Sequence, residues 1–271
     1  MKKAIIIGAS SGIGRELAKT LVSHDYVVGI TGRRTELLTE LQAELPNKCH
    51  MRTMDVSDTA KAIDTFNSLI AEMGGVDLVV ISAGTGHGTP DLRWPNEKDT
   101  IDTNVSGFTA IADTAFNHFV KQGHGHLVGI SSIAAIRGGR YAPAYNASKA
   151  FVCNYLEGLR HMAIKAKLPI YITDIQPGYV NTRMAQGDKI FWRASTEKAA
   201  KQIYRAIERK KPHAYVTRRW RLAAWVLKLM PNWCFKLNEL EVQENSPDKN
   251  LVDVSHLFKM SPRVRGTTGG W

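Results

Sequence analysis

Short apolar runs alternate along this chain with longer stretches in which apolar residues recur every three or four positions. The runs are rich in Val and Ile and are four to six residues long, which is typical of strands buried on both faces. They span Ala4–Ile7, Val27–Thr31, His50–Met54, Leu78–Ile81, His126–Ile130 and Ile170–Ile175. The stretches between them predict helices over Gly14–Ser23, Arg34–Glu44, Ala60–Met73, Trp94–Gln122 and Tyr145–Lys167. This alternation predicts an α/β fold with a doubly wound parallel sheet.

The alternation of apolar runs and helix-periodic stretches ends after about residue 187. Two further helices are predicted, over Thr196–Arg209 and over Arg218–Met230, with Pro231 ending the second. Beyond Glu241 the sequence is polar and rich in turn-forming residues, so we interpret 241–271 as a poorly packed C-terminal tail. Residues 1–240 then form a single domain, which includes a basic, Trp-rich helical extension within about 184–238.

Composition excludes several classes of protein. At 44% hydrophobic residues, a chain of 271 residues can bury a substantial core. Its three cysteines are far apart and form no CxxC motif, so we expect no disulfide framework and a reducing, cytoplasmic environment. No apolar run reaches the roughly 18 residues that a membrane span needs. We also expect no metal site, because the histidines of Gly123-His124-Gly125-His126 have no acidic partners beside them.

The net charge of +11 is concentrated late in the chain. Residues 188–238 hold 13 Lys and Arg against three acidic residues, and four of the six tryptophans. The predicted helix at 218–230 is basic, apolar and flanked by Trp, which leaves three interpretations open: contact with an anionic membrane surface, packing on the domain, or contact between subunits. We expect no nucleic-acid partner, because the tryptophans lie among aliphatic residues.

A glycine-rich loop, Gly8-Ala9-Ser10-Ser11-Gly12-Ile13-Gly14, joins the first predicted strand to the first helix. Glycine lets a ligand approach the backbone closely, and the N-terminus of the helix offers free N–H groups to a phosphate. In this strand-turn-helix context the loop predicts a Rossmann-like dinucleotide site. Its expected cofactor contacts are Gly8, Ser10, Ser11, Gly12, Ile13 and Gly14.

The end of the second predicted strand selects between the two nicotinamide dinucleotides. Sites that prefer NAD place an acidic residue there, whereas this chain has Arg33 and Arg34. A guanidinium pairs well with a phosphate, so we expect NADP(H), with Arg33 as the stronger candidate. For Arg34, a solvated position at the helix start is an equal alternative. At the end of the third strand, Asp55 and its neighbour Val56 are expected beside the adenine; an N-cap role for Asp55 is the alternative, which Ser57 or Asp58 would fill as readily.

Tyr145 and Lys149 stand four residues apart and therefore share one face of a predicted helix. A phenol has a reference pKa near 10, and a neighbouring ammonium lowers that pKa by stabilising the phenolate. The pair is therefore a candidate acid/base device.

These motifs occur together in a recognisable order. Gly8-x3-Gly12-x-Gly14, Asn104, Ser131-Ser132 and Tyr145-x3-Lys149 resemble the short-chain dehydrogenase/reductase family over roughly residues 3–215. The resemblance implies that Ser132, thirteen residues before Tyr145, is the catalytic serine, and that Asn104 holds a proton-relay water. It implies cofactor contacts from Ser82, Ala83 and Gly84, and from Pro177, Gly178, Val180 and Thr182; Asn104, Tyr145 and Lys149 also face the cofactor. The family usually has Asn where this chain has Ser82, which puts one structural brace in doubt.

The activity implied is NADPH-dependent hydride transfer between nicotinamide and a carbonyl or secondary alcohol. The region that forms the substrate lid in this family holds Met184, Ile190, Phe191 and Trp192, which favours an apolar substrate. Two alternatives stay open: a cofactor-binding, membrane-surface or regulatory relative, and an epimerase or dehydratase. By resemblance, the helices at 94–122 and 145–167 would form the interface of a homodimer or homotetramer. We expect a cytoplasmic protein, with a peripheral membrane contact left open.

Overall fold

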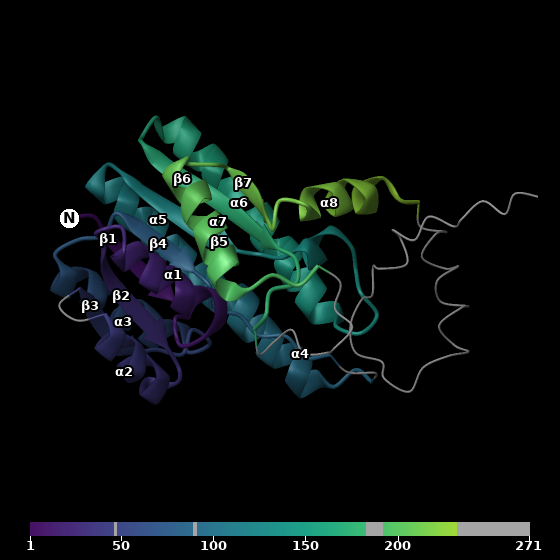
Figure 1. The fold of residues 1–271 in the computed structure, drawn as a ribbon, viewed down its shortest axis with the longest axis horizontal. Helices are drawn as coiled ribbons and strands as arrows, with labels where there is room; N and C mark the ends of the chain where they lie inside the picture. The colour runs from purple at the N-terminus through teal and green to yellow at the C-terminus, as the bar shows by residue number, and fades with distance from the viewer. Residues whose placement is uncertain (46–47, 89–90, 183–191, 232–271) are drawn as a thin grey trace, which may run out of the picture.

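The structure, a computed structural model, describes residues 1–45, 48–88, 91–182 and 192–231 (Figure 1). Within these ranges seven strands form one sheet in the order β3-β2-β1-β4-β5-β6-β7, and every neighbouring pair is parallel. The strands are β1 (Lys3–Ile7), β2 (Val27–Gly32), β3 (Cys49–Thr53), β4 (Leu78–Ile81), β5 (Gly125–Ile130), β6 (Ile170–Pro177) and β7 (His213–Val216). The predicted doubly wound, Rossmann-like sheet is confirmed.

Helices cover both faces of the sheet. The helical elements are α1 (Gly12–Val22), α2 (Thr35–Glu44), α3 (Thr59–Met73), α4 (Trp94–Ile101), the π-helical segment η1 (Asp102–Gly107), α5 (Phe108–Gln122), the 3-10 turn η2 (Ile133–Ile136), α6 (Pro143–Ala166), α7 (Thr196–Glu208) and α8 (Trp220–Leu229). Buried residues of α3, α5 and α6 pack on one face, and those of α1, α2 and α7 on the other. Because the strands are parallel, their carboxyl ends all lie at one edge of the sheet, where ligands bind in such folds.

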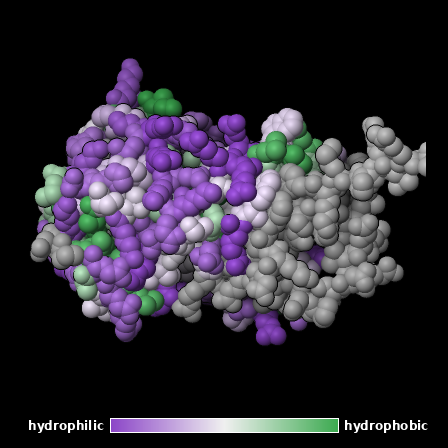
Figure 2. Space-filling model, in the orientation of Figure 1, coloured by the Kyte–Doolittle hydropathy of each residue, from purple (hydrophilic) through white to green (hydrophobic). Residues whose placement is uncertain are grey.

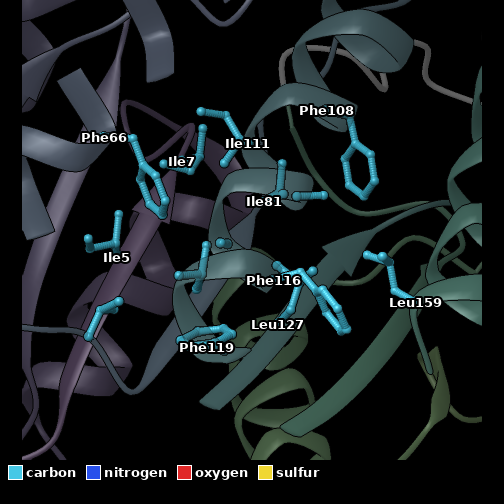
Figure 3. Close-up of a cluster of buried hydrophobic side chains, with 14 of the residues drawn as sticks. Ile5, Ile7, Phe66, Ile81, Phe108, Ile111, Phe116, Phe119, Leu127 and Leu159 are labelled. Atoms are coloured by element: carbon cyan, nitrogen blue, oxygen red, sulfur yellow. The ribbon is translucent and has the colours of Figure 1, made fainter. Parts of the chain in front are cut away.

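The core follows from the alternation of side chains along each strand. In β1, Ile5 and Ile7 face α3, α5 and α6, whereas Ala4 and Ile6 face α1, α2 and α7. Figure 3 shows the first of these two clusters, in which Phe66 and Phe119 approach the strands from the helices. Because both faces are covered, the strands read in the sequence as continuous apolar runs.

The seventh strand was not predicted from the sequence. It pairs with β6 from Asp174 opposite His213 to Pro177 opposite Val216. Only four residues form it, and the first three are half-buried, so it lacks the continuous apolar run that marked the other strands. The helix before it, α7, packs on α1. The predicted helical extension therefore contributes two elements to the domain: β7 forms one edge of the sheet, and α7 covers one of its faces.

The helix predicted over 94–122 is continuous but changes its winding in the middle. The π-helical segment η1 separates α4 from α5 and contains Asn104. A Cβ atom on Gly107, at the end of η1, would lie 2.5 Å from the carbonyl oxygen of Val56. Glycine thus lets this segment approach the chain that follows β3, and such π segments are frequent at functional sites.

Helix α8 is held against the carboxyl edge of the sheet. Its buried residues Trp220, Ala223 and Leu227 pack against Ile133 and Ile136 of η2, and against Tyr179, Trp192 and Tyr215. No helix within the described ranges is long and apolar enough to cross a membrane. The predicted lid residues Met184, Ile190 and Phe191 and the predicted tail at 241–271 lie outside the described residues.

Candidate active site

The glycine-rich loop packs too closely for side chains at two of its positions. A Cβ atom on Gly8, whose φ is +91°, would lie 2.5 Å from the backbone nitrogen of Ala83. A Cβ atom on Gly14 would lie 2.2 Å from the carbonyl oxygen of Gly8. The loop is thereby drawn tightly between β1, the end of β4 and the first turn of α1. The N–H groups of that turn are of the kind that can bind a phosphate. The side chain of Ile13 packs against the core on the α1 face, and its predicted contact with the cofactor stays a prediction.

Arg34 and Arg33 have different surroundings. The Nη2 atom of Arg34 donates hydrogen bonds to the Oγ atoms of Ser10 at 2.8 Å and Ser11 at 2.7 Å. Arg34 stands at the start of α2, as its N-cap residue, but its half-buried side chain is bound to the glycine-rich loop and is not simply solvated. The side chain of Arg33 is 55% exposed, and its Nη1 atom lies 3.9 Å from Oδ2 of Asp55. Arg33 and Asp55 line a pocket together with Thr53, Met54, Asp58, Lys61, Ala62 and Thr65.

Asp55 does not cap a helix. Its Oδ1 atom accepts hydrogen bonds from the backbone nitrogen of Ser57 at 3.0 Å and from the Ser57 hydroxyl at 2.7 Å. The N-cap of α3 is Asp58, which accepts from the backbone nitrogen of Lys61. The second carboxylate oxygen of Asp55 therefore stays on the pocket side, beside Arg33.

The two serines after β5 have separate partners. The Ser131 hydroxyl is buried and donates to Asp174 and to the carbonyl oxygen of Ile175 at 3.0 Å. The Ser132 hydroxyl accepts from the backbone nitrogen of Ala134 at the start of η2, and it also hydrogen-bonds the side chain of Tyr145. The hydroxyl of Ser132 therefore contacts the phenol of Tyr145, whereas the hydroxyl of Ser131 is hydrogen-bonded to the neighbouring strand, β6.

Tyr145 and Lys149 lie in the first turns of α6. The Nζ atom of Lys149 is 5.7 Å from the centre of the Tyr145 ring and donates to the carbonyl oxygen of Ile130 at 3.0 Å. Burial lowers the pKa of Lys149 to about 8, and the influence of Cys153 and Asp174 opposes this shift. Burial raises the pKa of Tyr145, and the opposing influence is the hydrogen bond with Ser132. We expected the Lys149 ammonium to lower the tyrosine pKa; in this structure its Nζ is turned to a main-chain carbonyl, and burial outweighs the other effects.

Asn104 ties the loop after β4 to α6. Its Oδ1 accepts from the backbone nitrogen of Thr85 at 2.8 Å, and its Nδ2 donates to the Thr85 carbonyl at 2.7 Å and to the Ser148 hydroxyl at 3.0 Å. Both amide N–H groups are therefore used, and Oδ1 keeps one free lone pair. A Cβ atom on Gly84 would lie 3.3 Å from that Oδ1 and 3.2 Å from Lys149 Nζ.

The remaining predicted contacts border the same edge of the sheet. The backbone nitrogen of Ser82 donates to the carbonyl oxygen of Ile7, which joins β4 to β1. A Cβ atom on Gly12 would lie 3.1 Å from the Cγ2 atom of Thr182. The loop that follows β6, which carries Thr182, therefore contacts the glycine-rich loop. Val180 is buried in the core, and Gly178 lies against the ring of Trp220.

A buried carboxylate that was not predicted from the sequence lies close enough to act on Lys149. Asp174 of β6 is 4% exposed and accepts from Ser131, from Gln176 Nε2 at 2.8 Å and from His213 Nδ1 at 3.1 Å. Burial raises its pKa, but the hydrogen bonds from His213, Ser131 and Gln176 outweigh burial and hold that pKa below its ordinary value. A lone acidic residue inside an otherwise apolar predicted strand was the signal that could have identified it.

A parallel sheet whose carboxyl edge holds a glycine-rich loop and a Ser-Tyr-Lys set defines a dinucleotide-binding oxidoreductase of Rossmann-like fold. Within the described residues, no group of His, Cys, Asp or Glu side chains is arranged to hold a metal ion. A family model for short chain dehydrogenases matches residues 2–191. The chain belongs to this family, and at that level it is an oxidoreductase.

Similar proteins include an uncharacterized oxidoreductase of Mycobacterium tuberculosis. It is 36% identical over 225 residues, which cover 79% of this chain and 88% of the relative. The NADP-dependent 3-hydroxy acid dehydrogenase YdfG of Escherichia coli is 30% identical over 179 residues, covering 65% of this chain and 71% of that protein.

Solved structures agree with the fold. The closed form of a serine dehydrogenase complexed with NADP+ superposes with a TM-score of 0.70 at 26% identity, covering 76% of this chain and 88% of that one. A 3-ketoacyl-(acyl-carrier-protein) reductase from Brucella melitensis complexed with NADH gives a TM-score of 0.73 at 21% identity, covering 80% and 98%. At that lower identity the likeness concerns the fold alone.

Proposed function

We propose that this protein transfers a hydride between NADP(H) and a carbonyl or secondary alcohol. The observation that carries the proposal is the convergence of Ser132, Tyr145 and Lys149 at the carboxyl edge of the sheet, next to the glycine-rich loop. A general acid, a hydrogen-bond donor and a cation at one edge suit the reduction of a carbonyl.

The residues present fit a dinucleotide phosphate cofactor. The close approaches at Gly8 and Gly14 leave a backbone cradle at the N-terminus of α1. Arg34 spans Ser10 and Ser11 of that cradle, and Arg33 stands exposed beside it. Two guanidinium groups at this position favour a ribose phosphate, and relatives named as NADP-dependent support the same choice. When bound, NADP(H) supplies or accepts the hydride.

The side chains of the chain handle the proton and the substrate oxygen. Ser132 donates a hydrogen bond to that oxygen and orients it. Tyr145 gives its proton to the oxygen as negative charge develops there; its raised pKa keeps the phenol protonated for this step at neutral pH. Lys149, with a pKa of about 8, carries positive charge at neutral pH and stabilises the phenolate left behind. The free lone pair of Asn104 Oδ1 and the Lys149 ammonium flank Gly84, where a relay water would be held.

The substrate is proposed to be apolar. Trp192, the described residue of the predicted lid, packs edge-to-face on Trp220, with ring centres 5.8 Å apart. Trp192, which is half-buried and backed by the fully buried Trp220, offers an apolar side chain near the loop at Gly178.

Oxidation of NADPH, followed by absorbance with a panel of ketones and aldehydes, tests the function. We expect turnover with an apolar member of the panel, stoichiometric loss of NADPH, and slower turnover with NADH. Tyr145→Phe should lower turnover by at least about a hundredfold while NADPH still binds, because the proton donor is gone. Normal turnover by that variant would contradict the role of Tyr145. Conversion of substrate without net NADPH loss would favour an epimerase or dehydratase, and NADPH binding without any turnover would favour a binding protein.

We further propose a homodimer or homotetramer that assembles through α4, α5 and α6. Small or apolar residues stand exposed on the outer side of α6, among them Ala147, Ala150 and Met162, and a Cβ atom on Gly158 would meet nothing within 4 Å. Such a surface allows two helices to approach closely. Light scattering on the intact chain distinguishes a monomer from these assemblies.

A further inference from the structure

Helix α8 exposes an apolar stripe. Leu222 is 59% exposed, Trp225 is 63% exposed and Leu229 is 63% exposed. Their spacing of three and four residues puts them on one face of the helix. Figure 2 shows hydrophobic residues gathered on the surface at the place where Figure 1 shows α8. We refer to Leu222, Trp225 and Leu229 as the α8 stripe.

The α8 stripe is not the face that attaches the helix to the domain. Trp220, Ala223, Ala224 and Leu227 form the buried face, on the other side of the helix. A helix on a globular surface normally has a polar outer face. An outer face that carries two leucines and a tryptophan therefore needs a second apolar environment to explain it.

Positive charge surrounds the α8 stripe. Residues 209–231 contain seven Lys and Arg and no Asp or Glu: Arg209, Lys210, Lys211, Arg218, Arg219, Arg221 and Lys228. Arg218, Arg219, Arg221 and Lys228 are exposed, so their charges stand in solvent around the stripe. Apolar and Trp side chains with a basic surround are typical of helices that lie in the interface of an anionic bilayer.

The helix is also joined to the active site. The guanidinium of Arg137 donates to the carbonyl oxygens of Leu227 at 3.2 Å and Met230 at 2.6 Å, near the end of α8. Arg137 directly follows η2, whose N-cap is Ser132. At the start of α8, Trp220 lies against Gly178, in the loop that follows β6. A surface that holds α8 therefore lies beside the catalytic edge of the sheet.

We propose that α8 lies in the interface of an anionic lipid bilayer through Leu222, Trp225 and Leu229, and that the enzyme takes an apolar carbonyl substrate from that bilayer. The substrate part of this inference rests on the proposed oxidoreductase function; the membrane contact does not. The basic surround selects lipid over a second copy of this chain, because two copies would bring their positive charges together.

Co-sedimentation of the full chain with vesicles tests the contact. We expect binding to phosphatidylcholine vesicles that contain phosphatidylserine, weak binding to pure phosphatidylcholine, and release by 0.5 M salt, about three times physiological ionic strength. Replacing the stripe (Leu222→Ser, Trp225→Ser, Leu229→Ser) should weaken binding at least about tenfold. The matched control, Leu92→Ser, removes an exposed apolar side chain from the segment before α4 and should bind like the parent chain.

A charge series separates local from overall electrostatics. Arg218→Gln, Arg221→Gln and Lys228→Gln together should weaken binding on the order of a hundredfold, because each basic residue near an anionic surface contributes about a fivefold factor. Lys198→Gln, Lys201→Gln and Arg205→Gln remove the same charge from α7 and should have a much smaller effect. Equal losses in the two triple variants, or no vesicle binding by the parent chain, would overturn the proposal. A stripe variant that changed the mass in solution without vesicles would assign the stripe to a subunit contact and also overturn it.

Turnover then tests the supply of substrate. Substituting the stripe should raise the KM for a long-chain ketone dissolved in anionic vesicles and leave turnover of a water-soluble aldehyde unchanged. An unchanged KM for the vesicle-dissolved ketone would overturn the supply of substrate from the bilayer. If the parent chain turned over no carbonyl in either form while binding vesicles, the proposed function would fail and the membrane contact would stand.

Discussion

Asp174 is a charged residue in a place where burial alone would keep a carboxyl neutral. Three side chains donate hydrogen bonds to it, and together they outweigh the cost of burial, so its pKa lies below the ordinary value. Its negative charge also acts on Lys149, whose pKa it raises against the effect of burial. The carboxylate therefore couples β6 electrostatically to Lys149 of α6.

We expect Asp174→Asn to lower the free energy of unfolding by about 2 kcal/mol at pH 7, because hydrogen bonds to a charged acceptor are lost. A carboxyl whose folded pKa is depressed contributes stability above its unfolded pKa and loses that contribution as pH falls through the folded pKa. The difference between parent and variant should therefore shrink below about pH 4. Urea denaturation at pH 7 and at pH 3.5 measures it; an equal difference at both pH values would contradict the assigned charge state.

The two arginines after β2 should have separable effects on cofactor binding. Arg33→Ala should reduce the preference for NADPH over NADH at least about tenfold, since a charged hydrogen bond to the extra phosphate is lost. Arg34→Ala should weaken both cofactors, because Arg34 holds Ser10 and Ser11 of the glycine-rich loop. Dissociation constants for NADPH and NADH measure these effects.

Arg52→Ala is the matched control for both changes, because Arg52 is an arginine of β3 that is paired with Glu72. It should alter neither constant. A preference unchanged by Arg33→Ala would remove Arg33 from the phosphate site.

At the scale of elements, the loop after β4 lies against the ring of Tyr145. Asn104 clamps the backbone of Thr85, and the next residue, Gly86, lies against the Tyr145 ring. A Cβ atom on Gly86 would lie 2.6 Å from Cδ2 of Tyr145. The π-helical segment η1 therefore affects the position of Tyr145 indirectly, because it carries Asn104, which holds this loop.

We expect Gly86→Ala to lower kcat/KM about tenfold or more, since the added methyl displaces Tyr145 at a cost of about 1–3 kcal/mol. Gly88→Ala changes the same loop at a point where a Cβ atom meets nothing within 4 Å, and should leave kcat/KM nearly unchanged. Steady-state kinetics with the identified substrate compares the two variants. Similar losses in both would show that the loop's flexibility, rather than the contact with Tyr145, matters.

At the scale of the whole molecule, Trp220 is the largest of the side chains that attach α8. Trp220 is 1% exposed and lies edge-to-face with Tyr179, with ring centres 5.6 Å apart. This contact fixes the C-terminal part of the described chain to the loop that follows β6. Trp225, five residues later, faces outward and takes no part in the attachment.

Trp220→Ala should lower the free energy of unfolding by about 3–5 kcal/mol, because a large buried ring leaves a cavity. Trp225→Ala should change it by no more than about 0.5 kcal/mol, as is usual for exposed positions. Urea denaturation of both variants tests the pair. Equal effects would mean that the two faces of α8 are not distinguished in solution.

Much of the fold followed from local pattern. Buried parallel strands produce continuous apolar runs, and β1, β2, β4, β5 and β6 were predicted nearly at their observed bounds. The strand β7 was not predicted, because most of its residues are half-buried at the edge of the sheet and form no apolar run. The change to π-helix at η1 was not predicted either, since six residues of π-helix leave no distinct periodicity in the sequence.

By itself the sequence determined six of the seven described strands, the alternation of helices between them and the family, because hydrophobic period and motif spacing are local properties of the chain. Only the tertiary structure decided how those side chains are charged and held. Three features depend on burial and on partners from distant segments: the direction of the Tyr145 pKa shift, the hydrogen bonds of Arg34 to the glycine-rich loop, and the effect of Asp174 on the pKa of Lys149. Desolvation and hydrogen bonding between such segments exist only after the chain has folded.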